Sequence, residues 1–235
     1  MGMTPVVERM VAAHTEILQQ SPKTLCFQHS FFCQTSLPYR KVEGTTWERT
    51  SGNLTMQLRA GTTANEKGEL IDLPLPNGPL ARLILIHLMT EAKVYGSRTI
   101  SLERTLTTFA KSVGIDTNGR NLKALRDQLQ RLAACSVVFS KKVGQKTRLV
   151  QGHLCESFEV FHVRRAGRSW CTELVLSEEF YESAVKHAVP LDPRAIQALR
   201  HSASCLDTYM WLASRLTRLK KPTVISWKTL HQQLG

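Results

Sequence analysis

The chain has 235 residues, 42% of them hydrophobic, and its 31 lysines and arginines outnumber 19 aspartates and glutamates to give a formal net charge of +12. This apolar content excludes a disordered chain and allows one large or two small globular domains. The positive charge favours a polyanionic partner, because each cation that neutralises a phosphate releases counterions. No run approaches the roughly 20 apolar residues of a membrane-spanning helix, and no signal-peptide pattern begins the chain. We therefore expect a cytoplasmic protein without a membrane partner.

The cysteines and histidines form no motif for catalysis. Six scattered cysteines without a C-x-x-C pair predict buried, reduced thiols. Cys26, His29 and Cys33 resemble a metal site, but a closed zinc site needs a fourth ligand and none is near. The sequence also lacks the His-x-His of a nicking enzyme, a complete P-loop and a carboxylate cluster for a two-metal nuclease. We predict no enzymatic activity, no metal and no cofactor.

Residues 1–69 predict an extension made of one helix and several strands. Thr4 caps the helix, Pro5 lies in its first turn, and Pro22 ends it. Short β-like segments follow at residues 25–32, 45–49 and 54–59. Residues 61–68 predict a loop. We expect the whole extension to pack on the domain that follows.

Residues 80–95 predict a helix that is apolar around most of its circumference. A proline-punctuated entry at residues 73–79 precedes it. Because such a helix is buried on several sides, we expect it to be central. His87 within it is expected at the edge of the core rather than as a ligand or a base.

Residues 101–113 predict the first helix of a pair. Ser101 caps this helix and Gly114 stops it. Its apolar stripe follows the 3.6-residue period and consists of Leu102, Leu106, Phe109, Ala110 and Val113.

The second helix of the pair is predicted to begin after a polar turn, where Thr117 or Asn118 can cap it. Its inward positions are Leu122, Leu125, Leu129 and Leu132. Its outer face carries Arg120, Lys123, Asp127, Gln130 and Arg131. A short helix, a tight turn and a second helix with a cationic face is the geometry that places a recognition helix in a major groove. The pattern leaves open that this face is only solvated.

A β-branched and aromatic run at residues 137–139 and a lysine-rich segment at 141–147 predict a strand and a basic hairpin tip. We expect this hairpin to add a wing to the helix pair. Residues 98–148 contain eleven Lys or Arg and three Asp or Glu, so they hold +8 of the net charge of +12. This concentration of charge favours DNA binding over a merely solvated surface.

Strands at residues 158–163 and 170–176 are expected to complete a small sheet with residues 136–140. Between them lies a second basic turn with Arg164, Arg165 and Arg168. This turn either contacts phosphates or keeps a hairpin tip soluble. A helix from Ser177 to His187 follows.

Residues 189–193 predict a boundary, after which the earlier pattern repeats. A helix to about His201 and a hydrophobic helix lead through a basic turn to a short strand at 223–226 and a helix at 227–234, much as in residues 80–114. The recognition helix and wing of this second copy would lie beyond Gly235. The chain is therefore either a fragment or a naturally shortened form.

These segments predict an α+β fold. A winged helix-turn-helix domain at residues 70–188 carries the N-terminal helix and strand extension at residues 1–69. An incomplete second winged-helix module follows at residues 189–235.

Several stretches resemble the plasmid-encoded RepA replication initiator family. They are residues 31–40 (FFCQTSLPYR), 46–49 (TWER), 75–84 (LPNGPLARLI), 90–92 (TEA), 209–216 (YMWLASRL) and 225–227 (ISW). The resemblance covers nearly the whole chain. It implies a tandem winged-helix initiator that binds repeated sites (iterons) in a plasmid origin, helps to open adjacent A·T-rich DNA, and recruits the host initiator ATPase and replicative helicase. It leaves open whether the protein is a monomer or a homodimer.

The candidate DNA-binding residues lie on the second helix, the hairpin and the later basic turn: Asn118, Arg120, Lys123, Arg131, Lys141, Lys142, Lys146, Arg148, Arg218, Lys220 and Lys221. We expect them to contact mainly phosphates, which fix register without carrying sequence information. The rival function is a winged-helix transcriptional repressor with no role in initiation. The flanking DNA separates the two, because an initiator predicts direct repeats spaced by whole turns of about 10.5 base pairs and a repressor predicts one inverted repeat.

Overall fold

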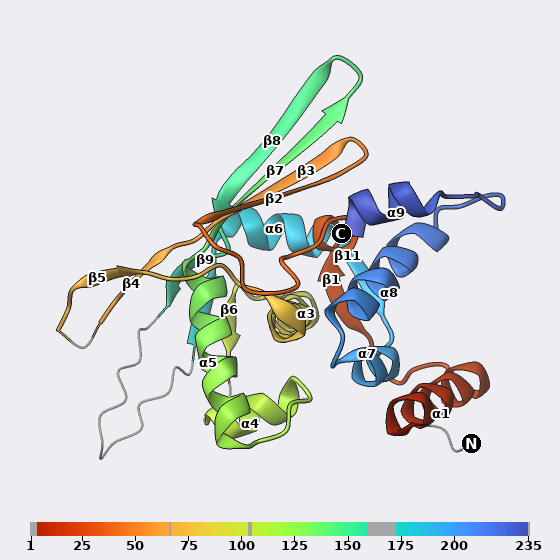
Figure 1. The fold of residues 1–235 in the computed structure, drawn as a ribbon, viewed down its shortest axis with the longest axis horizontal. Coiled ribbons are helices and arrows are strands. Elements are labelled where there is room, and N and C mark those ends of the chain that lie inside the picture. Colours follow the sequence, from red (N-terminus) through yellow and green to blue (C-terminus); the bar gives the residue numbers. More distant parts are fainter. Residues whose placement is uncertain (1–3, 66, 103–104, 159–172, 235) are drawn as a thin grey trace.

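The computed structural model describes residues 4–65, 67–102, 105–158 and 173–234 (Figure 1). These residues form helices and four antiparallel sheets, which confirms the predicted mixture of α and β structure. Within them, no helix is both long and apolar enough to cross a bilayer. The basic turn with Arg164, Arg165 and Arg168, and most of the two strands predicted beside it, lie outside the described residues.

Helix α3 (Gly78–Tyr95) is the central element, as its sequence predicts. Pro79 occupies its first turn, where a missing N–H costs nothing. Gly96 ends it in the left-handed conformation, with φ of +63° and its N–H bonded to the Ala92 carbonyl. The helix is buried on most of its circumference. It contributes residues to both of the hydrophobic clusters, and so it lies between them.

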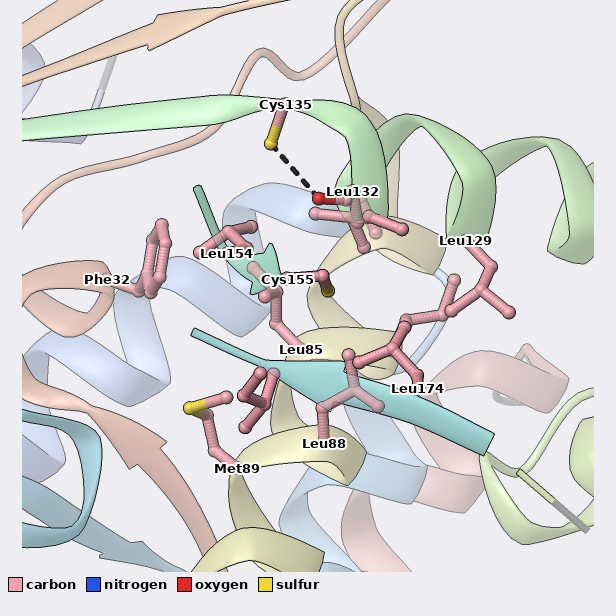
Figure 2. Packing of buried hydrophobic residues seen from close by; sticks show 14 of the residues in the cluster. Phe32, Leu85, Leu88, Met89, Leu129, Leu132, Cys135, Leu154, Cys155 and Leu174 are labelled. Atoms are coloured by element: carbon pink, nitrogen blue, oxygen red, sulfur yellow. Dashed lines mark hydrogen bonds between the residues drawn. The ribbon is translucent and has the colours of Figure 1, made fainter. Parts of the chain in front are cut away.

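The larger cluster lies between α3, helix α5 (Gly119–Ala134) and the sheets (Figure 2). Its members in the figure include Leu85, Leu88, Met89, Leu129, Leu132, Leu154 and Leu174. Cys135 belongs to it as a small apolar residue whose thiol donates to the Leu132 carbonyl at 3.3 Å. Burial raises the pKa of this thiol to about 12, so it is unreactive.

The helix pair follows α3 through strand β6 (Thr99–Ser101), helix α4 (Leu106–Ser112) and α5. The predicted start of the first helix at Ser101 is wrong. Ser101 is extended because it pairs with Glu173 of a neighbouring strand. The helix begins after Thr105, whose hydroxyl accepts from the Thr108 N–H in a capping box.

The turn between α4 and α5 approaches helix α7 (Pro193–Leu199) closely. It starts at Gly114, whose φ of +74° favours glycine. A Cβ there would also lie 2.0 Å from the side-chain nitrogen of Gln197 on α7. The predicted glycine stop is therefore confirmed, and the contact adds a steric reason that the sequence does not disclose.

Two sheets flank the helix pair. One has the order β2 (Thr46–Ser51), β3 (Leu54–Arg59), β7 (Ser136–Val143) and β8 (Lys146–His153); the other has the order β6, β10 (Glu173–Leu176) and β9 (Cys155–Phe158). The expectation that residues 136–140 join the later strands in one sheet is wrong. Strand β7 pairs with β3 on one side and β8 on the other, so it has no free edge for β9.

The predicted loop at residues 61–68 is also partly wrong. It contains strand β4 (Thr62–Ala64), which pairs with β5 (Leu70–Asp72). Asn65 closes this hairpin, because its side-chain oxygen accepts from the N–H groups of Lys67 and Glu69.

The last part of the chain packs against the first part. Strand β1 (Cys26–His29), which precedes helix α2 (Ser30–Gln34), pairs with β11 (Ala188–Leu191), so the sheet crosses both predicted boundaries. Arg194 of α7 also donates to the last carbonyls of helix α1 (Pro5–Gln19). The division into residues 1–69, 70–188 and 189–235 stays a prediction.

Three further helices complete the fold: α6 (Glu178–Lys186), α8 (Ala203–Leu216) and α9 (Trp227–Leu234). The strand predicted at residues 223–226 does not form. This segment is assigned to no strand, and Val224 is 99% exposed. A β-branched pair with no partner strand therefore remains a loop.

One buried ion pair joins α3 to α8. Arg82 binds both carboxylate oxygens of Asp207 at 2.6 and 2.7 Å, and its remaining N–H groups donate to the carbonyls of Leu37, Pro38 and Gly78. Both side chains are 2% exposed. Because every guanidinium nitrogen is bonded, the arrangement satisfies the condition under which a buried ion pair is tolerated. It fixes the position of α8 relative to α3.

Candidate nucleic-acid interface

Helix α5 presents a cationic face to solvent. Asn118 caps it, with its side chain accepting from the Asn121 N–H at 2.9 Å, which confirms one of the two predicted caps. Leu125, Leu129 and Leu132 are buried on the inner side, while Arg120 and Lys123 are exposed and Arg131 is half-buried. We call Asn118, Arg120, Lys123 and Arg131 the α5 surface.

The cations of the α5 surface are not neutralised by strong ion pairs. Lys123 lies 3.5 Å from Asp127, but its side chain is 78% exposed, and such a surface pair contributes little. Within the described part of the chain, neither Arg120 nor Arg131 forms an ion pair. The positive end of the helix dipole at Gly119 adds to their field.

Strands β7 and β8 form a long hairpin that extends from the body of the protein (Figure 1). Its turn contains Gly144 with φ of +61°. The cations on the hairpin are Lys141, Lys142, Lys146 and Arg148, all exposed. The predicted strand and basic tip are therefore confirmed.

Two of these cations continue the buried face of the hairpin. Lys141 and Arg148 are directly opposite each other, and on strand β7 Lys141 follows buried Val137 and Phe139 at alternate positions. Side chains at alternate positions share one face of a strand. Lys141 and Arg148 therefore face the same side as the core, just beyond where the core ends.

Residues from two other segments lie beside this end of the hairpin. His187 follows α6, and the centroid of its ring lies 6.5 Å from that of Phe31. The ring of Phe31 in turn contacts that of Phe139 on β7, with 4.5 Å between their centroids. Lys186 and His187 are exposed. The pKa of His187 is lowered by partial burial and then by the charges of Lys186, Arg148, Lys141 and Arg218.

Arg218 reaches the same region from the end of α8. It lines a cavity of about 260 Å³ together with Gly52 and Asn53 of the β2–β3 turn. The side-chain amide of Asn53 donates to the Lys142 carbonyl at 2.8 Å, and the Lys142 N–H donates to the Asn53 carbonyl at 2.8 Å. We call Lys141, Arg148, Lys186 and Arg218 the hairpin surface.

The structure thus divides the predicted DNA-binding residues into two groups. The tip of the β7–β8 hairpin and the α4–α5 turn lie at opposite ends of the molecule (Figure 1). The hairpin also belongs to the β2–β3 sheet and not to the sheet that contains β6. The expectation that the lysine-rich hairpin is the wing beside the recognition helix is therefore wrong. Lys220 and Lys221 are exposed in the segment after α8 and belong to neither group.

Sequence reasoning missed Lys186 and His187. They are separated from the hairpin by more than 30 residues, and no local pattern connects them to it. The only available signal was the Lys–His pair at the end of a predicted helix.

The histidines belong to no candidate metal site among the described residues. No group of three or more His, Cys, Asp or Glu there is placed to hold a metal ion. Burial lowers the pKa of His29 to about 3, with a further contribution from His187, and burial lowers that of His87 to about 4. His29 accepts from the Phe31 N–H at 3.0 Å, which is a structural role.

The chain matches the family model described as plasmid encoded RepA protein over residues 75–229. No curated protein matches it. Among solved structures, it is similar to a selenomethionine derivative of domains 2 and 3 of RctB, with a TM-score of 0.57, 14% identity, and coverage of 88% of this chain and 77% of that one. A second structure of RctB domains 2-3 gives a TM-score of 0.55 at 14% identity, with coverage of 88% and 76%. At this identity the likeness shows the fold alone.

Proposed function

Because the chain belongs to the family of plasmid-encoded RepA proteins, we propose that it is a replication initiator that binds duplex DNA at a plasmid origin. The observation that carries this proposal is the α5 surface. It places exposed cations on a helix that follows a tight turn, without strong ion pairs to neutralise them. A helix of 16 residues is about 24 Å long and about 10 Å wide, which suits a B-DNA major groove about 12 Å wide.

The order of elements supports a winged-helix unit around α5. Helix α3, strand β6, helices α4 and α5, and strands β9 and β10 follow one another, and β10 lies between β6 and β9. Strands β9 and β10 then take the place of the two strands that follow the recognition helix in such a unit. The β7–β8 hairpin is an insertion between α5 and β9.

The finer features of the proposal come from the family resemblance. They are binding to iterons, opening of adjacent A·T-rich DNA, and recruitment of the host initiator ATPase and replicative helicase. The alternative is a repressor with the same fold. Direct repeats on one face of the neighbouring DNA, and loss of the plasmid on deletion of the gene, support the initiator. A lone inverted repeat with normal maintenance supports the repressor.

A titration with origin and scrambled duplexes at two salt concentrations tests DNA binding by α5. We expect the triple variant Arg120→Gln, Lys123→Gln and Arg131→Gln to weaken binding to both duplexes and to reduce the slope of log K against log salt by about 0.9 per lost contact. Glutamine keeps the apolar part of each side chain in place.

The matched control replaces three exposed cations that belong to neither surface, Lys23, Lys41 and Lys228, with glutamine. It removes the same charge, so a loss common to both variants reports net charge alone. An unchanged slope in the α5 variant would show that this face is only solvated.

A further inference from the structure

The hairpin surface collects like charges from three separate segments of the chain. Lys141 and Arg148 come from the β7–β8 hairpin, Lys186 from the end of α6, and Arg218 from the segment after α8. Nothing in local sequence requires these cations to meet. Their approach is a product of the tertiary fold.

These cations are not paired with acids. Among the described residues, none of the four forms an ion pair with a carboxylate. The pKa of His187, next to Lys186, is lowered first by partial burial and then by charges that are all cationic. Such a cluster repels itself in the free protein, and the repulsion is relieved when a polyanion binds.

The surroundings favour duplex phosphates over single-stranded bases. A single-strand site needs aromatic rings on which bases can stack. The rings beside the hairpin surface are already engaged, because Phe31 contacts Phe139 at 4.5 Å and His29 lies stacked 5.9 Å from Phe139. What remains exposed is charge, which binds a phosphate backbone without reading its sequence.

We propose that the hairpin surface is a second binding site for duplex DNA, which holds a segment other than the one held by α5. This inference rests on the proposed function, since both surfaces are assigned the same class of ligand. A sheet-forming hairpin with eight residues in each strand is about 26 Å long, and α5 is about 24 Å long. The two elements extend toward opposite ends of the molecule (Figure 1), so a duplex of about 10 base pairs, about 34 Å long, does not reach from one tip to the other.

The stoichiometry of short duplexes bound to the full chain tests the proposal. The probe is a fluorescein-labelled duplex of about 10 base pairs, titrated at low salt, where phosphate contacts are strongest. We expect two duplexes per chain. The variant Lys141→Gln, Arg148→Gln and Arg218→Gln should bind one, as should the triple glutamine variant of the α5 surface, and the Lys23, Lys41 and Lys228 control should still bind two.

A bridging experiment gives a second readout. The native chain should retain the labelled duplex on beads that carry a second, biotinylated duplex, and the hairpin variant should lose this retention while it still binds either duplex alone. Sedimentation of the free chain checks that one chain, rather than a dimer, makes the bridge. The substituted residues are exposed except for Arg131, which is half-buried and whose glutamine replacement keeps the apolar part of the side chain, so circular dichroism and thermal unfolding are expected to match the native chain.

The outcomes separate the two proposals. One duplex per chain, with affinity and salt slope unchanged in the hairpin variant, would overturn the second site and leave DNA binding by α5 intact. A native chain that binds no duplex at low salt would overturn the proposed function itself, and the second site with it.

Discussion

The α5 surface and the hairpin surface are both cationic, but they are built in different ways. The α5 surface lies on one helix, whose cations are held outward because leucines at helical spacing occupy the core. The hairpin surface requires a hairpin, the end of α6 and the end of α8 to be placed correctly at the same time. The first should therefore survive changes that shift one element relative to another, whereas the second should not.

The largest expected effect comes from breaking the buried ion pair that positions α8. Asp207→Asn leaves the Arg82 guanidinium buried without its counter-charge, which should cost about 3 to 5 kcal/mol of unfolding free energy. Urea denaturation measures this loss. Because Arg218 follows α8, DNA binding at the hairpin surface should weaken more than binding at α5 in conditions where the variant remains folded.

A matched change at the surface is the control for that result. Asp127→Asn removes a carboxylate from the exposed pair with Lys123 and should change stability by less than about 0.5 kcal/mol. Equal losses in the two variants would contradict the assignment of Arg82 and Asp207 as the link between α3 and α8.

The next effect concerns the core beneath the α5 surface. Leu125 is fully buried, so Leu125→Ala should cost about 2 to 5 kcal/mol through the cavity it leaves. DNA affinity should fall only in proportion to the unfolded fraction, measured by denaturation and binding in the same buffer. Leu149→Ala on β8, at a side chain that is 63% exposed, should change stability by less than about 0.5 kcal/mol. A fall in affinity of fully folded Leu125→Ala protein would mean that the core shapes the surface directly.

How far the sequence predicts each surface follows from the same difference. Helical period and a cap residue were enough to place Leu125 inside, Arg120 outside and Asn118 at the start of α5. The strand at residues 223–226 was predicted from composition and fails, because strand formation depends on a partner that the sequence pattern does not supply. The prediction that Ser101 caps a helix is wrong because a partner strand is present: its pairing with Glu173 overrides its propensity to cap.

The hairpin surface shows the same limit at the level of function. Lys141 could be predicted as part of a basic tip, but the separation of the hairpin from α5 depends on which sheet β7 joins, and β7 joins its sheet by pairing with β3. Lys186 and Arg218 join the surface only through the packing of α6 and α8. Long-range pairing, rather than local pattern, is what sequence reasoning could not recover.

The cap of α5 gives a smaller and local prediction. Asn118→Ala removes the acceptor for the Asn121 N–H and should cost about 1 kcal/mol, measured by thermal unfolding. Asn118→Asp keeps an acceptor and should restore stability, while its negative charge should weaken DNA binding at α5. Binding at the hairpin surface should be unaffected by either change. If both surfaces weaken together, they are not independent.

The smallest effect is electrostatic and uses His187 as an internal reporter of the hairpin surface. Cations favour the neutral imidazole, so they lower its pKa, and screening them should raise it. We expect the pKa of His187, followed by NMR and assigned with His187→Gln, to rise when salt is increased from about 20 mM to about 500 mM. The Lys141, Arg148 and Arg218 glutamine variant should show a raised pKa already at low salt, and bound duplex should raise it because phosphate stabilises the imidazolium. His87 is the control, since burial alone lowers its pKa and salt should leave it unchanged. If the pKa of His187 changes neither with salt nor with the three substitutions, these cations do not form one surface.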